Sequence, residues 1–151
     1  MIRCYLALGS NLKSPQRQLR QAIQRIRRTS RIHVLQTASL YKTPAWGRKN
    51  QPFFYNTVLA IGTTLAPHAL LKTCLAIEAQ QGRQRKVKWG ARTLDIDLIF
   101  YGDKQIKTPS LIVPHPRWFE RDFVLLPLEE LRRRPRTNCQ LAPSLQGSQN
   151  A

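Results

Sequence analysis

Hydrophobic residues recur along this chain with two different periods, and segments of the two kinds follow one another. Runs of apolar and β-branched residues bounded by Gly, Pro, Asn or Ser are typical of strands, whereas apolar residues spaced three and four apart are typical of helices. On this basis strands are predicted at residues 2–8, 32–41, 53–63 and 92–101.

The helical pattern occurs three times. Residues 15–28, "PQRQLRQAIQRIRR", begin with a proline and place their apolar side chains on one helical face. A second helix is predicted from Pro67 to about Gln81, followed by Gly82, a residue suited to the left-handed conformation that ends many helices. A third helix is predicted within residues 116–131, with an interruption at Pro127.

The resulting order of elements is β-α-β-β-α-β, followed by an extra hairpin within residues 106–113 and by the third helix. We therefore predict an α+β fold, a ferredoxin-like α/β sandwich in which helices pack on an antiparallel sheet. Residues 1–131 would form a single domain. Residues 132–151 are basic and lack periodicity, and we expect a flexible C-terminal tail there.

The composition is that of a folded domain, because 42% of the 151 residues are hydrophobic. No run of 18 apolar residues occurs, so the sequence predicts no membrane span. The apolar N-terminal run lacks a small-residue cleavage site and is interpreted as the first strand, not a signal peptide. Three widely spaced cysteines predict reduced thiols in a cytoplasmic protein.

The charge is strongly unbalanced. Lys and Arg total 25 against 8 acidic residues, a net charge of +17, and the first acidic residue is Glu78. This balance favours a polyanionic partner: a nucleic acid, an anionic membrane or a phosphorylated small molecule. A solvated basic surface without a partner is the alternative that charge alone leaves open.

The stretch "RTLDIDLIF" carries two aspartates in an otherwise apolar strand. Asp95 and Asp97 share a strand face, where like charges repel unless a cation binds between them. Carboxylate oxygens suit Mg²⁺, although two solvent-facing aspartates on an edge strand are the alternative. The strict alternation predicts Thr93, Asp95, Asp97, Ile99 and Tyr101 on one face, and Leu94, Ile96, Leu98 and Phe100 on the apolar face.

A basic loop precedes this strand. Carboxylates for a metal and cationic groups for phosphate are what phosphoryl transfer requires, although an ordinary solvated loop is the alternative. No Walker-type or G-x-G-x-x-G loop occurs, so phosphate would be bound by side chains and metal. His115, close to Arg117 and Arg121, is a further candidate phosphate ligand. The loop carries Arg83, Arg85, Lys86, Lys88, Trp89 and Arg92.

Five stretches together resemble the 6-hydroxymethyl-7,8-dihydropterin pyrophosphokinase family of folate biosynthesis. They are "YLALGSNL", "SLYKTPAWG", "QPFFYNTV", "IEAQQGRQRKVKWGARTLDIDLIFYGD" and "VPHPRWFERDFVLLPL", and the resemblance covers residues 3 to about 128. The fourth stretch, similar to a W-G-x-R-x-L-D-x-D signature, is the most specific. The resemblance implies a ferredoxin-like fold and Mg²⁺-dependent transfer of pyrophosphate from ATP to the pterin, with AMP as the other product.

The resemblance also implies the role of each site residue. Two Mg²⁺ ions that arrive with ATP would be held by Asp95 and Asp97, and the catalytic arginines would be Arg83 and Arg92. ATP would be bound by Arg85, Lys88, Trp89, His115 and Arg121. The pterin would be bound by Thr43, Pro44, Trp46, Phe54, Asn56 and Phe123.

A basic ferredoxin-like module that binds RNA is the rival hypothesis. Such modules place aromatic residues on exposed sheet positions within glycine-rich strand motifs, and no K/R-G-F/Y-G/A-F-V pattern occurs here. We therefore expect ATP and dihydropterin as the partners of a monomeric, cytoplasmic enzyme, with neither nucleic acid nor membrane.

Overall fold

The computed structural model describes residues 1–12, 14–43, 53–82 and 94–133. In chain order the elements are β1 (Ile2–Ser10), α1 (Pro15–Arg28), β2 (Ile32–Thr37), β3 (Tyr41–Thr43), β4 (Phe54–Thr63), α2 (Pro67–Gln80), β5 (Asp95–Tyr101), β6 (Ile106–Lys107), β7 (Ile112–Val113), the 3₁₀ helix η1 (Trp118–Glu120) and α3 (Asp122–Arg133).

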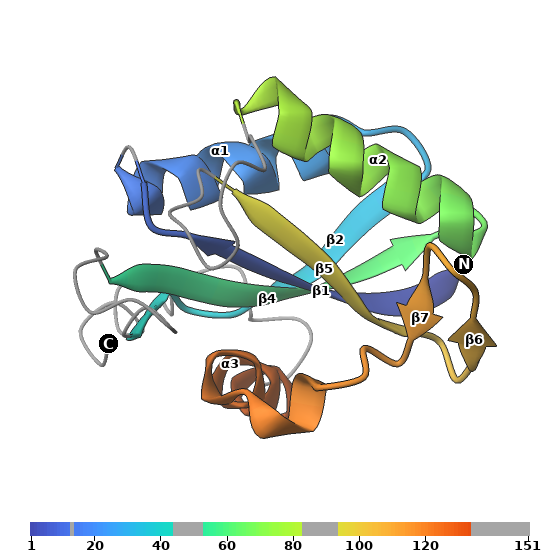
Figure 1. Cartoon of the computed structure of the whole chain (residues 1–151). Coiled ribbons are helices and arrows are strands. Elements are labelled where there is room, and N and C mark those ends of the chain that lie inside the picture. The colour runs from blue at the N-terminus through green and yellow to red at the C-terminus, as the bar shows by residue number, and fades with distance from the viewer. Residues whose placement is uncertain (13, 44–52, 83–93, 134–151) are drawn as a thin grey trace.

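The sheet has the predicted ferredoxin-like topology. Its strand order is β2-β4-β1-β5, with β3 also paired to β4, and the neighbouring strands are antiparallel. Helices α1 and α2 lie on one face of the sheet and α3 lies on the other (Figure 1). The extra hairpin is the short β6–β7 pair. The α+β prediction is therefore confirmed, and none of the described helices has the length and apolar character needed to cross a membrane.

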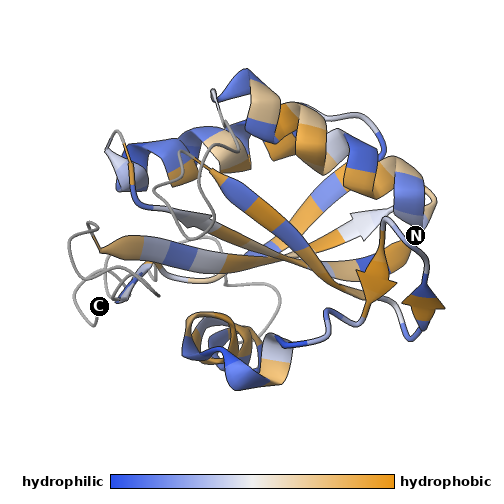
Figure 2. Ribbon diagram, viewed as in Figure 1, coloured by the Kyte–Doolittle hydropathy of each residue, from blue (hydrophilic) through white to orange (hydrophobic). Residues whose placement is uncertain are grey.

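Two apolar cores lie on the two sides of the sheet. The first core packs α1 and α2 against it and contains large side chains such as Leu6, Leu59 and Leu70. The second core packs α3 against the opposite face and is rich in alanine, including Ala7 and Ala60. The central strand β4 contributes to both cores, and its orange bands in Figure 2 reflect this double burial.

The predicted strand at residues 32–41 is two strands. β2 ends at Thr37, and β3 begins at Tyr41. Between them, the backbone N–H of Ser39 donates to the carboxylate of Glu130 on α3. The ladder is interrupted here because a distant side chain takes this donor, which the local sequence pattern does not reveal.

The predicted faces of β5 are correct only for its first half. Leu94, Ile96 and Leu98 belong to the first core as expected. A bulge in the β1–β5 pairing then adds a residue, so Phe100 packs with the second core and Tyr101 with the first. A β-bulge reverses the alternation that follows it, and this is why the strict alternation assigned these two residues to the wrong faces.

The third helix also differs from the prediction. Residues 118–120 form the separate turn η1, and α3 begins at Asp122. Pro127 lies inside α3 without ending it, and its ring is buried. A proline removes one helical hydrogen bond, but the burial of its ring offsets part of that cost. α3 ends at Arg133, two residues beyond the predicted domain boundary.

Candidate active site

The candidate site follows a row of paired residues across the sheet. Tyr41 on β3 pairs with Asn56 on β4, Asn56 pairs with Gly9 on β1, and Gly9 pairs with Asp95 on β5. Directly paired residues of antiparallel strands point to the same face. The row therefore brings the predicted pterin-binding and metal-binding residues to one face, the face that α3 partly covers.

The two aspartates occupy the edge strand β5. Asp95 and Asp97 are half-buried and alternate with the buried residue Ile96. Their partners on β1 are Gly9 and Ala7, two of the smallest residues. The predicted placement of both aspartates on the face opposite Ile96 is confirmed, and Figure 2 shows the corresponding alternation of blue and orange bands along β5.

Gly9 is a site residue that sequence reasoning missed. A Cβ atom at this position would lie 2.7 Å from Asn56 Oδ1 and 3.8 Å from the ring of Phe54. Only glycine allows the Asn56 side chain to lie over β1. The available signal was a glycine inside a strand pattern, which often marks a close approach of a neighbouring group.

Asn56 forms the centre of the predicted pterin pocket. Its side chain is 5% exposed, and its Nδ2 donates a hydrogen bond of 2.8 Å to Thr43 Oγ1. Phe54 lies two residues earlier on the same face, is half-buried and belongs to neither core. The structure thus brings Thr43, Phe54 and Asn56 together at the β3–β4 end of the row.

Phe123 comes to this face of the sheet from the first turn of α3. Its ring is half-buried, packs beside the second core and lies 5.5 Å from the guanidinium carbon of Arg121. This pair presents a charged group next to an aromatic ring, a combination that suits contact with an anion beside a flat ring. Phe123 is therefore only partly core, in contrast to Val124 beside it, which is buried.

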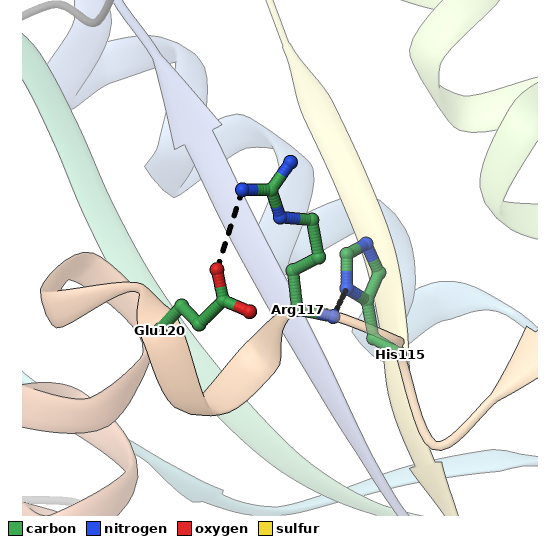
Figure 3. A network of polar contacts seen from close by, with 3 residues as sticks. All are labelled: His115, Arg117 and Glu120. Carbon is green, nitrogen blue, oxygen red and sulfur yellow. Dashed lines mark hydrogen bonds and ion pairs between the residues drawn. The ribbon is translucent and has the colours of Figure 1, made fainter.

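His115 is attached to β5 through its backbone. Its N–H donates to Ile99 O at 3.0 Å, and the N–H of Arg117 donates to His115 Nδ1 at 3.3 Å (Figure 3). Burial, and secondarily the charge of Arg121, lower the pKa of the imidazole below 6.5, while Asp95 opposes this shift. The ring is therefore neutral at pH 7. Because Nδ1 accepts a hydrogen bond, the ring proton is assigned to Nε2.

The guanidinium group of Arg117 pairs with Glu120. It contacts the Glu120 carboxylate at 3.2 Å, as Figure 3 shows. Exposed pairs of this kind contribute little to stability, but the contact occupies the side chain. Arg121, rather than Arg117, is thus the cation placed beside His115.

Several predicted site residues lie outside the described residues, and their roles stay predictions. These are Pro44, Trp46, Arg83, Arg85, Lys88, Trp89 and Arg92.

Part of the positive charge lies away from the site. Arg17, Arg20, Arg27 and Arg28 are exposed on α1, which covers the opposite face of the sheet (Figure 1). The site therefore does not account for all of the net charge of +17. The two cysteines in the described ranges, Cys4 and Cys74, are free and buried, as predicted for reduced thiols.

A divalent cation fits the chemistry of the aspartate pair. Within the described ranges no cluster of three or more His, Cys, Asp or Glu side chains forms a complete protein cage. Mg²⁺ usually takes only one or two carboxylates and completes its shell with phosphate oxygens and water. Asp95 and Asp97 match that donor set, provided that a polyphosphate supplies the remaining ligands.

The structure thus places an acidic pair and an aromatic and amide cluster on one face of a ferredoxin-like sheet. The family of 7,8-dihydro-6-hydroxymethylpterin-pyrophosphokinase (HPPK) matches residues 5–133. The chain belongs to this family.

Curated relatives agree with this assignment. The chain is similar to the 2-amino-4-hydroxy-6-hydroxymethyldihydropteridine pyrophosphokinases of Methylorubrum extorquens and Haemophilus influenzae. It is 43% identical to each over 131 residues, which cover 87% of this chain and 83% and 82% of theirs. The Bacillus subtilis enzyme of that name is 42% identical over 127 residues, covering 84% of this chain and 76% of that one.

A solved structure supports the fold. The crystal structure of an HPPK-DHPS in complex with substrates superimposes with a TM-score of 0.64 at 13% identity. The likeness covers 97% of this chain and 43% of that chain, and at this identity it shows the fold alone.

Proposed function

We propose that the chain transfers pyrophosphate from ATP to 6-hydroxymethyl-7,8-dihydropterin in folate biosynthesis, with the residues of the sheet row in defined roles. The activity follows from membership of the family. The observation that supports the roles is the register Asn56–Gly9–Asp95, which sets the pterin pocket two strands from the acidic pair. Two strand spacings amount to about 9.5 Å, comparable to the length of a pterin with its hydroxymethyl arm.

In the proposed reaction the hydroxymethyl oxygen of the pterin attacks the β-phosphorus of ATP. The new O–Pβ bond forms, the bridging bond from Pβ to the α-phosphate oxygen breaks, and AMP leaves. The hydroxyl proton passes to solvent. Catalysis of such a transfer depends on positioning and on neutralising charge, with little covalent chemistry for the protein.

Asp95 and Asp97 would hold two Mg²⁺ ions together with the phosphates of ATP. When bound, these ions supply charge neutralisation at the transferred group. The partners of the two aspartates on β1, Ala7 and Gly9, are small residues that would not compete with phosphate for the space beside the carboxylates. His115, neutral and protonated on Nε2, would donate to a phosphate oxygen, and Arg121 would add a positive charge next to it.

On the pterin side, Asn56 would form hydrogen bonds with the polar edge of the ring. Its hydrogen bond to Thr43 fixes the orientation of the amide. Phe54 and Phe123 would cover the two faces of the ring, with Pro44 and Trp46 nearby in the chain. On the ATP side, Arg83, Arg85, Lys88, Trp89 and Arg92 would close over the nucleotide. These assignments rest on the family resemblance. We also propose that the enzyme acts as a monomer in the cytoplasm.

The test is the stoichiometry of product formation. Purified protein is incubated with ATP, Mg²⁺ and 6-hydroxymethyl-7,8-dihydropterin, and the nucleotides are separated by chromatography. We expect AMP and the pterin pyrophosphate in equal amounts, and neither when Mg²⁺ or the pterin is omitted. Formation of ADP, or ATP consumption that is independent of the pterin, would contradict the proposal.

A further inference from the structure

Glu78 on α2 is buried without belonging to the site just described. It is the one charged residue among the buried side chains of the described ranges, with 3% of its surface exposed. Its Oε2 accepts a hydrogen bond of 2.6 Å from the backbone N–H of Ile96. Ile96 stands between Asp95 and Asp97, so this carboxylate is attached to the backbone of the acidic segment.

The contact occurs at an edge of the sheet. Among the described strands, β5 is the last in the order β2-β4-β1-β5 and pairs with β1 alone. The open side of an edge strand presents backbone N–H groups that need other partners. Glu78 supplies such a partner from α2, so the segment that bears the aspartates is held by β1 on one side and by Glu78 on the other.

A second buried titratable group, the thiol of Cys74, lies near Glu78. Cys74 lies one turn before Glu78 on α2, and burial raises the pKa of its thiol to about 12, with further contributions from Glu78 and Asp97. Burial of a carboxylate is costly, and the hydrogen bond from Ile96 to Glu78 reduces this cost.

A second carboxylate, Glu130 on α3, forms hydrogen bonds beside the predicted pterin-binding residues. Glu130 accepts from Ser39 N at 3.1 and 3.2 Å, from Ser39 Oγ at 3.0 Å and from the Tyr41 hydroxyl at 2.7 Å. Tyr41 is the residue paired with Asn56. Through these bonds α3, which carries Phe123, is fastened to the strand that ends in Thr43.

We propose that Glu78 and Glu130 are positioning residues, each for one half of the site. Glu78 holds the two aspartates in register for the metal–nucleotide complex, and Glu130 holds β3 and α3 together around the pterin. In these roles each carboxylate acts through the protein groups that it holds. The inference rests on the proposed function, and it assigns separate consequences to the loss of each residue.

The expected loss of affinity can be estimated from other proteins in which a group orients a metal-binding side chain without touching the metal. Groups that orient metal-binding side chains typically change metal affinity or activity about 10- to 100-fold when they are removed. Glu78→Met removes the acceptor while it keeps a side chain of similar length. Glu78→Gln keeps an oxygen that accepts from Ile96. The methionine variant should therefore lose function that the glutamine variant largely recovers.

The experiment measures the two halves of the site independently of turnover. Mn²⁺ binding in the presence of α,β-methylene ATP, an analogue that resists cleavage, is followed by electron paramagnetic resonance. Binding of 6-hydroxymethylpterin is followed by titration calorimetry. For Glu78→Met we expect Mn²⁺ affinity to fall about 10- to 100-fold and pterin affinity to change less than about threefold. For Glu130→Met we expect the reverse pattern.

Controls on the same helices separate positioning from general effects of substitution. Lys72→Gln on α2 and Glu129→Gln on α3 are exposed positions and should leave both affinities unchanged. Each variant is measured well below its own melting temperature. If Glu78→Met does not fold, Glu78→Asp withdraws the acceptor by one methylene group, and a selective loss of Mn²⁺ affinity is again expected.

The outcomes distinguish the inference from the proposed function. Parallel loss of both affinities in each methionine variant, or wild-type affinities in both, would overturn the positioning roles. Failure of the glutamine variants to recover affinity would likewise contradict the hydrogen-bond argument. If the wild-type protein itself makes no AMP, the proposed function fails, whatever the variants bind.

Discussion

The two faces of the sheet differ in the side chains that they carry. On the face covered by α1 and α2, β1, β4 and β5 contribute large apolar side chains to the first core, for example Leu6, Leu59 and Leu98. On the α3 face the same strands are apolar in one half only, at Ala7, Val58 and Ile99. The other half of that face carries the candidate site.

The difference shows how one sheet supports both a stable fold and an open site. The first face buries large apolar side chains such as Leu6, Leu8 and Leu59, and burial of this kind dominates the folding free energy. The second face is covered by one helix of 12 residues, close to the sheet because alanines lie beneath it. The other half holds polar groups whose burial is partial or offset: Asp95 and Asp97 are half-buried, and the buried amide of Asn56 is hydrogen-bonded to Thr43.

The largest expected effect follows from breaking the acidic pair. Asp95→Ala or Asp97→Ala should lower turnover by roughly three orders of magnitude or more, since each removes a proposed metal ligand. The melting temperature should stay the same or rise, because repulsion between two like charges is lost. Steady-state AMP formation and a thermal melt measure the two quantities. Asp103→Ala, at an exposed turn after β5, is the matched control and should be fully active.

The opposite result is expected on the other face. Leu6→Ala removes a fully buried side chain from the first core and should lower the free energy of unfolding by about 2–5 kcal/mol. Both ligands should still bind with normal affinity at temperatures where the variant is folded. Urea denaturation together with calorimetry would show this. A selective loss of one ligand would mean that the two faces are not independent.

Phe54 and Phe123 test where the boundary between core and site lies. If both rings cover the pterin, alanine at either position should weaken pterin binding by about 1–3 kcal/mol and leave ATP binding in the binary complex nearly unchanged. Phe123, which packs beside the second core, should also lower the melting temperature more than Phe54. Large destabilisation without selective loss of the pterin would assign the ring concerned to the core.

The smallest expected effect concerns Gly9, the residue of β1 that pairs with both Asn56 and Asp95. In Gly9→Ala the added methyl group would lie 2.7 Å from Asn56 Oδ1, so the amide must rotate and give up its bond to Thr43. Pterin affinity should fall about tenfold, on the scale of one strained contact. Ala7→Gly, one position further along the same face, is a control that adds no atoms near Asn56. Undiminished pterin binding in Gly9→Ala would remove Asn56 from the pocket.

Local sequence determined most of the elements and the chemistry of the aspartate strand. The alternation around Asp95 and Asp97 placed both carboxylates on one face, and helix periodicity identified α1 and α2 within a residue or two. These features depend on residues a few positions apart, where side-chain period is set by backbone geometry. The family resemblance then indicated the reaction and named candidate ligands.

Tertiary structure alone decided which distant residues complete the site. The bulge that turns Phe100 to the α3 face depends on pairing with β1, and the break between β2 and β3 depends on Glu130, 91 residues from Ser39. The contact of Glu78 with Ile96 likewise joins a helix to a strand edge. Hydrogen bonds and steric contacts of this kind act between elements that meet only after folding, so no local pattern in the chain records them.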